Sequence, residues 1–462
     1  MTNRKFISGG TVVLENRCVK ATTVIENGII SDILLPSAKT ENGEVIDASG
    51  MYVMPGFVEI HAHGGGGFDF MDATEQAFAE IASTHLRHGT TSILPTTVAC
   101  SIESMERLFD IYRKVSGRSK INMLGLHLEG PYISYEMKGA QNAAFVRNPS
   151  KKEIDRLIDN NGDIIRMCTA APELDGIEYM SKRMTDKNIT LSVGHSNGIC
   201  ADARRAKELG FTHMTHLYSN TPSVRKINQV VYAGLLEAAY LYDFDIELIG
   251  DGHHIAKEVL QLALKFKGAD RINMTSDAMR AAGTNADTSW LGEILPENRV
   301  IIEDGVAKLP DRSFFAGSIA TGDVMLKWAV NTCGINICDA SKMLSKTPSR
   351  VIGESRKGVI RRGADAVVQR TVVQRRPVGE RHHRAAAHAA DAVFVGAADG
   401  VGSRGRVQCD RDVRLYGVAD HARAPQADLL LHGEGQPQVV FRLRFGDGEQ
   451  QRAADAVIDR LT

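Results

Sequence analysis

The stretch FVEIHAHGGGGFDFMDA, residues 57–73, places two histidines at the end of an apolar run and follows them with four glycines. The run FVEI is typical of a buried strand. Because alternate residues of a strand face the same way, His61 and His63 should point to one side. Two imidazoles on one face, beside glycines that let the backbone approach a ligand closely, indicate a metal-binding strand end.

Seven later apolar runs repeat this setting: SILP (92–95), INMLGLHL (121–128), IIRMCTA (164–170), ITLSVGH (189–195), THMTH (212–216), DIELIG (245–250) and RINMTSDA (271–278). Between them, stretches such as residues 72–89 show apolar residues near a 3.6-residue period and a closing glycine. Repeated strand–helix units predict a parallel α/β architecture. A doubly wound sheet and a (β/α)8 barrel both fit, although no GxGxxG follows the first strand, which disfavours a dinucleotide-binding sheet.

Residues 1–53 predict a separate, smaller unit. Four β-branched runs, broken by Asn-Gly or Gly, are typical of short strands: TVVLEN (11–16), ATTVIENG (21–28), IISDILL (29–35) and EVIDASG (44–50). We expect the second half of this region to form a small antiparallel sheet ahead of the strand–helix repeats.

The composition changes after residue 357. Residues 1–357 contain 20 lysines and 19 arginines, whereas residues 358–462 contain 16 arginines and no lysine. The Arg/Ala-rich tail, residues 367–462, shows no clear strand or helix period over most of its length. Two explanations stay open: a variable or partly disordered tail, and an out-of-frame reading of a GC-rich gene. The second requires that another frame of the gene continue a sheet sequence past residue 366.

Charge and hydropathy exclude several classes of partner. A formal net charge of −1 over 462 residues gives no support for nucleic acid or an anionic membrane as a partner. No window approaches the 18 uninterrupted apolar residues that a membrane span needs, and the N-terminus predicts no secretory signal. The seven scattered cysteines are predicted to be free thiols in a reducing compartment. We therefore expect a cytoplasmic protein with a small-molecule substrate.

Four further ligand-type residues stand at the carboxyl ends of predicted strands: Glu129, His195, His216 and Asp277. In a parallel barrel all strand carboxyl ends open onto one face, where active sites lie. Any one of these residues alone also fits a hydrogen-bonded core position. Together with the first two histidines they predict one shared metal centre. His and carboxylate ligands suit Zn, Fe, Mn or Co about equally well, so the identity of the metal stays open.

The same stretches resemble the amidohydrolase superfamily and, within it, the N-acetylglucosamine-6-phosphate deacetylases. The resemblance covers residues 1–366, and its motifs include PGFVEIHAHG (55–64), HLEGPYIS (127–134), KGAQNAAFV (138–146), VGHSNG (193–198), THLYSNTPSVR (215–225), GDGHHI (250–255) and TSDAM (275–279). It implies a (β/α)8 TIM barrel over residues 54–345. It also implies a small β-sandwich built from residues 1–53 and from a C-terminal return that starts at 346–366.

The resemblance also implies a centre for one or two divalent metal ions. Its ligands would be Glu129, His195 and His216 as in the deacetylases, His61 and His63 as in two-metal members, and Asp277 near the first ion. Asp277 would also take a proton from the attacking water and pass it to the leaving amine nitrogen. Glu59 stands where an aspartate is more usual before the histidine pair, which is a mild departure from the family pattern.

On the substrate side, the resemblance implies contacts from Gln141, Ser219, Asn220, Arg225 and His254. Ser219 and Asn220 occupy positions where Asn and Ala are usual, so the phosphate end departs from the family pattern. Arg225 is the predicted phosphate contact, because a guanidinium binds phosphate with two parallel hydrogen bonds. Some contacts in this family come from a neighbouring subunit, which implies a homodimer.

The implied reaction is hydrolysis of the N-acetyl group of N-acetylglucosamine 6-phosphate, which gives glucosamine 6-phosphate and acetate in amino-sugar catabolism. Two alternatives stay open. The substrate could be another N-acyl or cyclic amide, because the phosphate-end motif departs from pattern. The chain could also be inactive, because residues 357–366 run into VVQRTVVQRR where the family completes its sandwich.

Overall fold

The computed structural model describes residues 4–366, 368–371, 392–395, 427–428 and 442–443. The chain consists of two compact units, Met1–Arg404 and Gly405–Thr462. The second unit contributes only the short antiparallel pair β27 (Ala427–Asp428) and β28 (Arg442–Leu443) to the described residues. Most of the tail whose composition is unusual, residues 367–462, therefore lies outside the described residues, and the first unit carries the fold.

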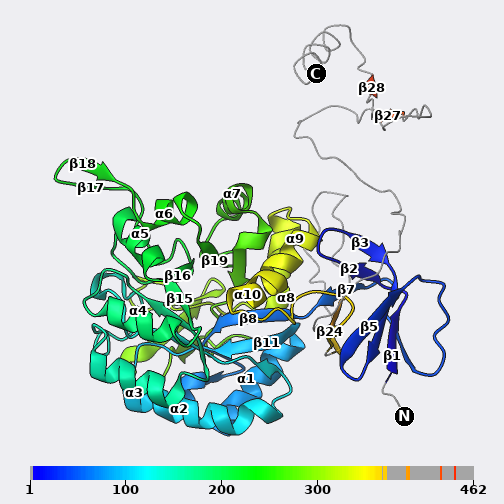
Figure 1. Cartoon of the computed structure of the whole chain (residues 1–462), viewed down its shortest axis with the longest axis horizontal. Helices are drawn as coiled ribbons and strands as arrows, with labels where there is room; N and C mark the ends of the chain where they lie inside the picture. The colour runs from blue at the N-terminus through cyan, green and yellow to red at the C-terminus, as the bar shows by residue number, and fades with distance from the viewer. Residues whose placement is uncertain (1–3, 367, 372–391, 396–426, 429–441, 444–462) are drawn as a thin grey trace. The chain divides into compact units, whose positions relative to one another are not determined.

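A TIM-barrel-like ring of parallel strands forms the core of this unit (Figure 1). In ring order the strands are β8 (Phe57–Ala62), β11 (Thr90–Pro95), β13 (Leu126–Glu129), β14 (Ile165–Ala170), β15 (Thr190–Val193), β16 (Phe211–Met214), β19 (Asp245–Ile249) and β20 (Ile272–Thr275). They belong to two parallel sheets, which the bridges Thr96–His127 and Ala62–Ala278 connect at both edges. Because the last strand meets the first, the ring excludes the doubly wound alternative.

Helices connect these strands and surround them (Figure 1). They are α1 (Glu75–Arg87), α2 (Ile102–Val115), α3 (Lys151–Asn161), α4 (Ile177–Thr185), α5 (Cys200–Glu208), α6 (Leu235–Leu241), α7 (Lys257–Lys267), α8 (Gly322–Lys327), α9 (Ile337–Ser341) and α10 (Thr347–Val351). In α2, the buried residues Met105, Leu108, Phe109 and Tyr112 recur every three or four positions, as packing of one face onto the barrel requires. The helix predicted within residues 72–89 is confirmed as α1, whose cap Thr74 accepts a hydrogen bond from the Ala77 amide.

One predicted strand is divided in the structure. The run at 121–128 forms β12 (Asn122–Met123), which pairs with β11, and β13, which pairs with β14. Gly125 between them has φ +127°, and a Cβ there would lie 2.2 Å from Arg166 Cγ. The break therefore requires glycine at this position. The apolar pattern does not reveal the break, because both halves are buried or half-buried.

The N-terminal strands lie in two sheets beside the barrel (Figure 1). One sheet has the order β24 (Ala364–Asp365), β5 (Ile29–Leu34), β4 (Thr22–Glu26), β1 (Arg4–Ser8), β6 (Glu44–Asp47). The other has the order β25 (Val368–Thr371), β26 (Ala392–Val395), β7 (Tyr52–Pro55), β2 (Thr11–Val13), β3 (Cys18–Lys20). Ile7, Ile30, Val53, Ile360 and Ala364 share one buried apolar cluster that draws on both sheets and on the returning chain.

The prediction of a small antiparallel sheet in the second half of residues 1–53 is confirmed for β4 and β5 but wrong for β6 and β7. Strands β1 and β6 pair in parallel, as do β2 and β7. Strands β5 and β6 run in the same direction, so residues 35–43 must carry the chain back to the starting edge before β6 begins.

Within the described part of the chain, no helix combines the length and the apolar character that crossing a bilayer would need. No disulfide joins the six cysteines of this part, in agreement with the prediction, and Cys409 lies outside it.

Candidate active site

The predicted ligands converge at the carboxyl ends of five barrel strands. His61 lies in β8 and His63 follows directly after it, whereas Glu129 is the last residue of β13. The other three each stand two residues beyond the end of a strand: His195 after β15, His216 after β16 and Asp277 after β20. Chain segments far apart in the sequence thus present six ligand-type side chains to one space, as the strand-end pattern predicted.

These last three residues share a strained backbone. His195, His216 and Asp277 have φ values of 48°, 28° and 48°, in the left-handed region that non-glycine residues rarely adopt. Such a conformation persists only where neighbouring structure fixes it, and it concentrates at functional sites. The Asp277 amide donates to the His61 carbonyl at 3.0 Å and its carbonyl accepts from the Ser318 amide at 2.8 Å. The barrel closure therefore holds this turn in place.

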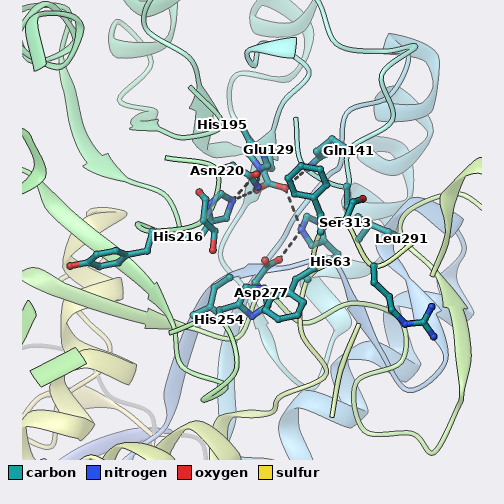
Figure 2. Close-up of a pocket in the computed structure, with 18 residues that line it drawn as sticks. His63, Glu129, Gln141, His195, His216, Asn220, His254, Asp277, Leu291 and Ser313 are labelled. Atoms are coloured by element: carbon teal, nitrogen blue, oxygen red, sulfur yellow. Dashed lines mark hydrogen bonds and ion pairs between the residues drawn. The ribbon is translucent and has the colours of Figure 1, made fainter. Parts of the chain in front are cut away.

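Glu129 lies at the centre of the group (Figure 2). Its Oε1 is 2.9 Å from Nε2 of His216, 3.2 Å from Nε2 of His195 and 3.3 Å from Nε2 of His61. Its Oε2 is 3.4 Å from Nε2 of His63. One carboxylate thus touches all four histidines, so the two halves of the site share it.

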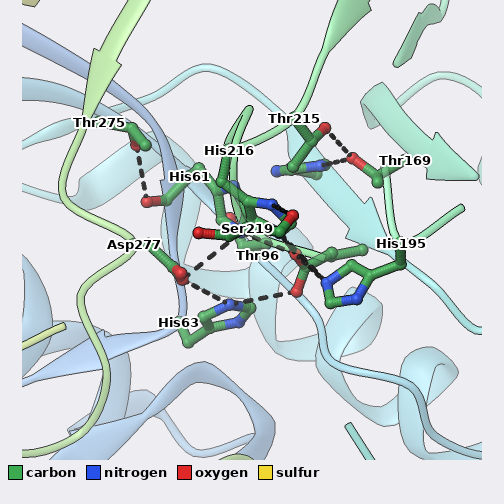
Figure 3. A network of polar contacts seen from close by, with 12 residues as sticks. His61, His63, Thr96, Thr169, His195, Thr215, His216, Ser219, Thr275 and Asp277 are labelled. Carbon is green, nitrogen blue, oxygen red and sulfur yellow. Dashed lines mark hydrogen bonds and ion pairs between the residues drawn. The ribbon is translucent and has the colours of Figure 1, made fainter. Parts of the chain in front are cut away.

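Asp277 closes the other side of the group (Figure 3). Its Oδ1 is 3.2 Å from His63 Nε2 and 3.6 Å from His61 Nε2. The ligand atoms within each of two buried trios lie no more than 4.8 Å apart: His61, His63 and Glu129 form one trio, and Glu129, His195 and His216 form the other.

Several ring nitrogens in the group lack the partners that a metal-free site would need. His61 Nε2, which lies 3.3 Å from Glu129 and 3.6 Å from Asp277, is buried without a hydrogen-bond partner among the described residues. The Nε2 atoms of His195 and His216 face each other at 3.1 Å. A buried polar atom left unpaired costs about 1–3 kcal/mol. Lone pairs directed at a common centre beside two carboxylates fit a divalent cation, so this donor set suits a metal.

Opposite charges hold one another in place within this group. Burial disfavours a charged Glu129, but the His61 charge and hydrogen bonds from neighbouring rings lower its pKa well below the usual value. Burial likewise disfavours a charged His63, but hydrogen bonds to Asp277 and Glu129 raise its pKa to about 10. The buried, ionised carboxylates are thus stable only with positive charge beside them. Either protons on the histidine rings or a bound cation can provide that charge.

A second shared carboxylate, Glu247 in β19, was not predicted from the sequence. It is completely buried and accepts hydrogen bonds from His61 Nδ1 at 2.8 Å, the His216 amide at 3.1 Å and Asn273 Nδ2 at 2.9 Å. Burial opposes its charge, but the positive charge of His61 brings its pKa below the usual value. The available signal was a glutamate inside the otherwise apolar run DIELIG.

Glu59, the departure from the usual aspartate, joins the first and last barrel strands. Its carboxylate accepts hydrogen bonds from the His61 amide at 3.0 Å, the Ser276 amide at 2.9 Å and the Thr275 hydroxyl. Burial raises the pKa of this carboxyl despite these bonds. Glu59 therefore contacts the backbone on both sides of the ligands and lies outside the ligand group itself.

A cavity of about 440 Å³ opens onto the ligands (Figure 2). Four of the predicted substrate residues line it: Gln141, Ser219, Asn220 and His254. Gln141 donates from Nε2 to Glu129 Oε2 at 2.6 Å and accepts from the Ala99 amide at 2.7 Å, so it connects the ligand group to the cavity wall.

His254 presents one ring nitrogen to the cavity and has the other engaged. Its Nδ1 is 2.7 Å from Asp251 Oδ2, and the ring meets Phe315 edge-on at 4.9 Å between centroids. Phe315 comes from a loop that the sequence analysis did not assign to the site. The same loop contributes Arg312 and Phe314 to the cavity wall.

Arg225 is the predicted substrate residue that does not line the cavity. It lies on β17 (Arg225–Ile227), and its guanidinium donates to the side-chain and backbone oxygens of Asn197 at 2.6 and 2.5 Å. Among the described lining residues, the arginine is Arg312, which pairs with Glu303 at 3.0 and 3.1 Å. It sits in a loop without a motif, which is why the sequence did not reveal it.

The four glycines, residues 64–67, follow directly after His63 and are not among the residues that line the cavity. A Cβ on Gly64 would lie 2.2 Å from the Phe68 carbonyl oxygen and 3.0 Å from the Arg280 amide, and Gly66 has φ +64°. The loop is fastened by Arg280, whose Nη1 and Nη2 each lie 2.7 Å from an oxygen of Asp72. Glycine is thus needed because two backbone segments come into contact at the ligands.

Replacing Arg280 with alanine should lower the free energy of unfolding by about 3–5 kcal/mol, since it leaves a largely buried Asp72 carboxylate without its partner. Chemical denaturation followed by circular dichroism measures the change. Arg280→Lys is the matched control, because it keeps the charge and loses only the pair of parallel hydrogen bonds. Its free energy of unfolding should lie between those of the wild type and Arg280→Ala. A decrease below 1 kcal/mol for alanine would show that the pair does not fasten the loop.

Comparisons with known proteins agree with this geometry. The sequence pattern described as the Amidohydrolase family matches residues 52–371. The N-acetylglucosamine-6-phosphate deacetylase of Haemophilus influenzae is 31% identical over 346 residues, which cover 74% of this chain and 88% of that protein. The deacetylase of Rattus norvegicus is 30% identical over 376 residues, which cover 79% of this chain and 89% of that protein.

A solved structure of similar fold is N-acetylglucosamine-6-phosphate deacetylase from Pasteurella multocida. It has a TM-score of 0.74 and 28% identity, and the match covers 80% of this chain and 95% of that one. Sequence pattern, relatives and fold all cover the barrel that carries the ligands. The chain belongs to the amidohydrolase family, in the branch of the N-acetylglucosamine-6-phosphate deacetylases.

Proposed function

We propose that this protein hydrolyses the N-acetyl group of N-acetylglucosamine 6-phosphate to give glucosamine 6-phosphate and acetate. The observation that carries the proposal is the sharing of Glu129 between two buried trios at the mouth of a sugar-sized cavity. Relatives that cover most of this chain bear the name of this activity. A mutant of the Mycobacterium smegmatis enzyme, 25% identical with a TM-score of 0.69, was solved in complex with N-acetyl-D-glucosamine-6-phosphate.

The proposed cofactor is one or two divalent ions, drawn from Zn, Fe, Mn and Co. Glu129, His195 and His216 would hold one ion, and His61 and His63 would join Glu129 around a second, with Asp277 beside it. Such a cation would lower the pKa of a bound water so that hydroxide, the attacking nucleophile, forms near neutral pH. It would also polarise the amide carbonyl.

The proton transfers are assigned to the Asp277 carboxylate. It would accept the proton of the attacking water and donate it to the amide nitrogen, because an amine leaves readily only after protonation. His254 Nε2 and Gln141 would orient the acetamido sugar, since both line the cavity and each is fixed by a hydrogen bond on its far side. Ser219 and Asn220 would contact the phosphate end.

The phosphate itself needs a cation, and two arginines are candidates. Arg312 lines the cavity of its own subunit. Arg225 stands at the base of a hairpin, β17 and β18 (Val230–Tyr232), which projects from the barrel (Figure 1). Val230 and Val231 on this hairpin are 55% and 59% exposed, which supports the proposal of a homodimer that covers them. In such a dimer Arg225 would serve the partner's cavity.

We extend the proposal to the domain plan. The two N-terminal sheets form a small β-sandwich from residues 1–53 and the C-terminal return that starts at 346–366, and residues 54–345 form the (β/α)8 barrel. The apolar cluster that joins Ile7 and Val53 to Ile360 supports this plan.

Purified protein should release acetate from N-acetylglucosamine 6-phosphate, and the rate should fall when a chelator removes the metal and recover when zinc returns. Unphosphorylated N-acetylglucosamine should react at least about tenfold more slowly, because one charge-assisted contact to the phosphate contributes about 1.5–3 kcal/mol. Soluble, metal-loaded protein that releases no acetate would favour the second candidate, another N-acyl or cyclic amide. Loss of solubility would instead implicate residues 367–462.

A further inference from the structure

Glu247 stands behind His61 on the side away from the cavity. Its Oε1 lies 2.8 Å from His61 Nδ1, and both side chains are completely buried. An ionised carboxylate only accepts hydrogen bonds, so Nδ1 must carry the proton of this contact. The other ring nitrogen, Nε2, faces the Glu129 and Asp277 carboxylates without a hydrogen-bond partner among the described residues, and once deprotonated it would present a lone pair there.

The other histidines of the group are held differently. Nδ1 of His195 faces the Met137 carbonyl at 2.7 Å, and Nδ1 of His216 faces the Ser219 carbonyl at 3.2 Å. Within the described group, His61 is therefore the ring that a carboxylate orients. A carboxylate behind a ligating imidazole fixes its tautomer and raises its basicity more than a neutral carbonyl does.

The surroundings of Glu247 also determine what a substitution would do. Its remaining partners are the His216 amide and Asn273 Nδ2. Oδ1 of Asn273 is buried and has no hydrogen-bond partner in the described part of the chain. A glutamine at 247 could keep its oxygen on His61 while its amide group meets a flipped Asn273. Glu247→Gln should therefore fold and remove only the charge.

We propose that Glu247 is the positioning residue of the His61–His63 half of the metal centre, where it presents the His61 Nε2 lone pair to a divalent cation. This inference rests on the proposed function only in taking the two trios as metal subsites. Neither the relatives nor the strand-end pattern assigns a role to this glutamate.

The experiment measures metal retention, not activity. Zinc-loaded full-length protein is dialysed against graded chelator, and zinc per subunit is determined by mass spectrometry. We expect Glu247→Gln to release one zinc ion at about 10- to 100-fold lower chelator than the wild type, the range that orienting partners of metal ligands show. The second ion, on the His195–His216 trio, should be retained as in the wild type.

The matched control is Asp323→Asn. Asp323 makes the same kind of contact, with its Oδ1 2.8 Å from His88 Nδ1, and it is buried outside the cavity lining. This variant should keep both ions. The proposal would be overturned if Glu247→Gln kept both ions up to the same chelator concentration as the wild type, whether or not its unfolding temperature were lower. Glu247 would then have a purely structural role.

A double variant tests whether Glu247 acts through His61. In a His61→Ala background, where the first ion is already lost, adding Glu247→Gln should change retention of the remaining His195–His216 ion less than twofold, because the inference gives Glu247 no effect on metal binding except through His61. A further loss there would overturn the proposal.

If the wild type binds only one zinc ion, His61→Ala is measured first. If this variant keeps the ion, the inference is overturned. If it loses the ion, Glu247→Gln must also weaken the binding of that ion. The expected zinc losses without any acetate release would refute the deacetylase function and leave this inference standing.

Discussion

Asp277→Asn is expected to lower kcat by about 10²–10⁴-fold with KM changed much less, since proton transfer by a positioned side chain contributes that range. Asparagine has the shape of aspartate but can neither accept the proton of water nor donate one to the leaving nitrogen. The backbone at this position, held at φ 48°, tolerates asparagine better than most residues. Steady-state acetate release measures the effect.

The metal content of this variant must be determined alongside its rate. The trio of Glu129, His195 and His216 does not include Asp277 and should keep its ion. Asp323→Asn again provides the control, because it neutralises a buried carboxylate outside the cavity lining. A rate within tenfold of the wild type would remove Asp277 from the proton transfers and leave it as a ligand alone.

His61→Ala with His63→Ala is expected to lose the ion of their trio and at least about 10²-fold in kcat/KM, because the Lewis acidity of a bound cation provides several kcal/mol. Both rings are buried and their Nε2 atoms lie within 3.4 Å of Glu129. The measurements are zinc per subunit and acetate release on the same sample.

His253→Ala is the control for this pair, because His253 precedes the cavity residue His254 but is itself exposed. It should keep its zinc and its rate. Normal zinc content in the double variant would show that His61 and His63 bind no metal. The interpretation of residues 57–73 as a metal-binding strand end would then be wrong.

The apolar runs were sufficient to predict the parallel strands, whereas their closure into a ring was implied only by the family resemblance, because the runs also fit a doubly wound sheet. Each of the eight runs contains a barrel strand, because strands buried on both faces are marked by continuous apolar sequence. The division at Gly125 and the parallel pairing of β1 with β6 were not predictable, since both depend on where the chain turns in space.

The structure groups the ligand residues as predicted, because strand ends meet at one face regardless of the details of each loop. Glu247 was missed, since a glutamate within a strand shows no period that separates a buried partner of histidine from an edge residue. Arg312 and Phe315 were missed because a loop has no period at all. Arg225, the predicted phosphate contact, instead bonds to Asn197, and its sequence motif does not show which partner the guanidinium takes in the fold.

The bridge between Ala62 and Ala278 also has a consequence for biosynthesis. A ribosome delivers His61 and His63 early, yet their counterpart Asp277 emerges only after the whole ring of strands has been translated. No nascent chain that stops short of β20 can hold the complete ligand set. Assembly of the full ligand set must therefore wait until β20 and Asp277 have left the ribosome, so a metal supplied to this centre meets a chain that already carries all eight strands of the ring.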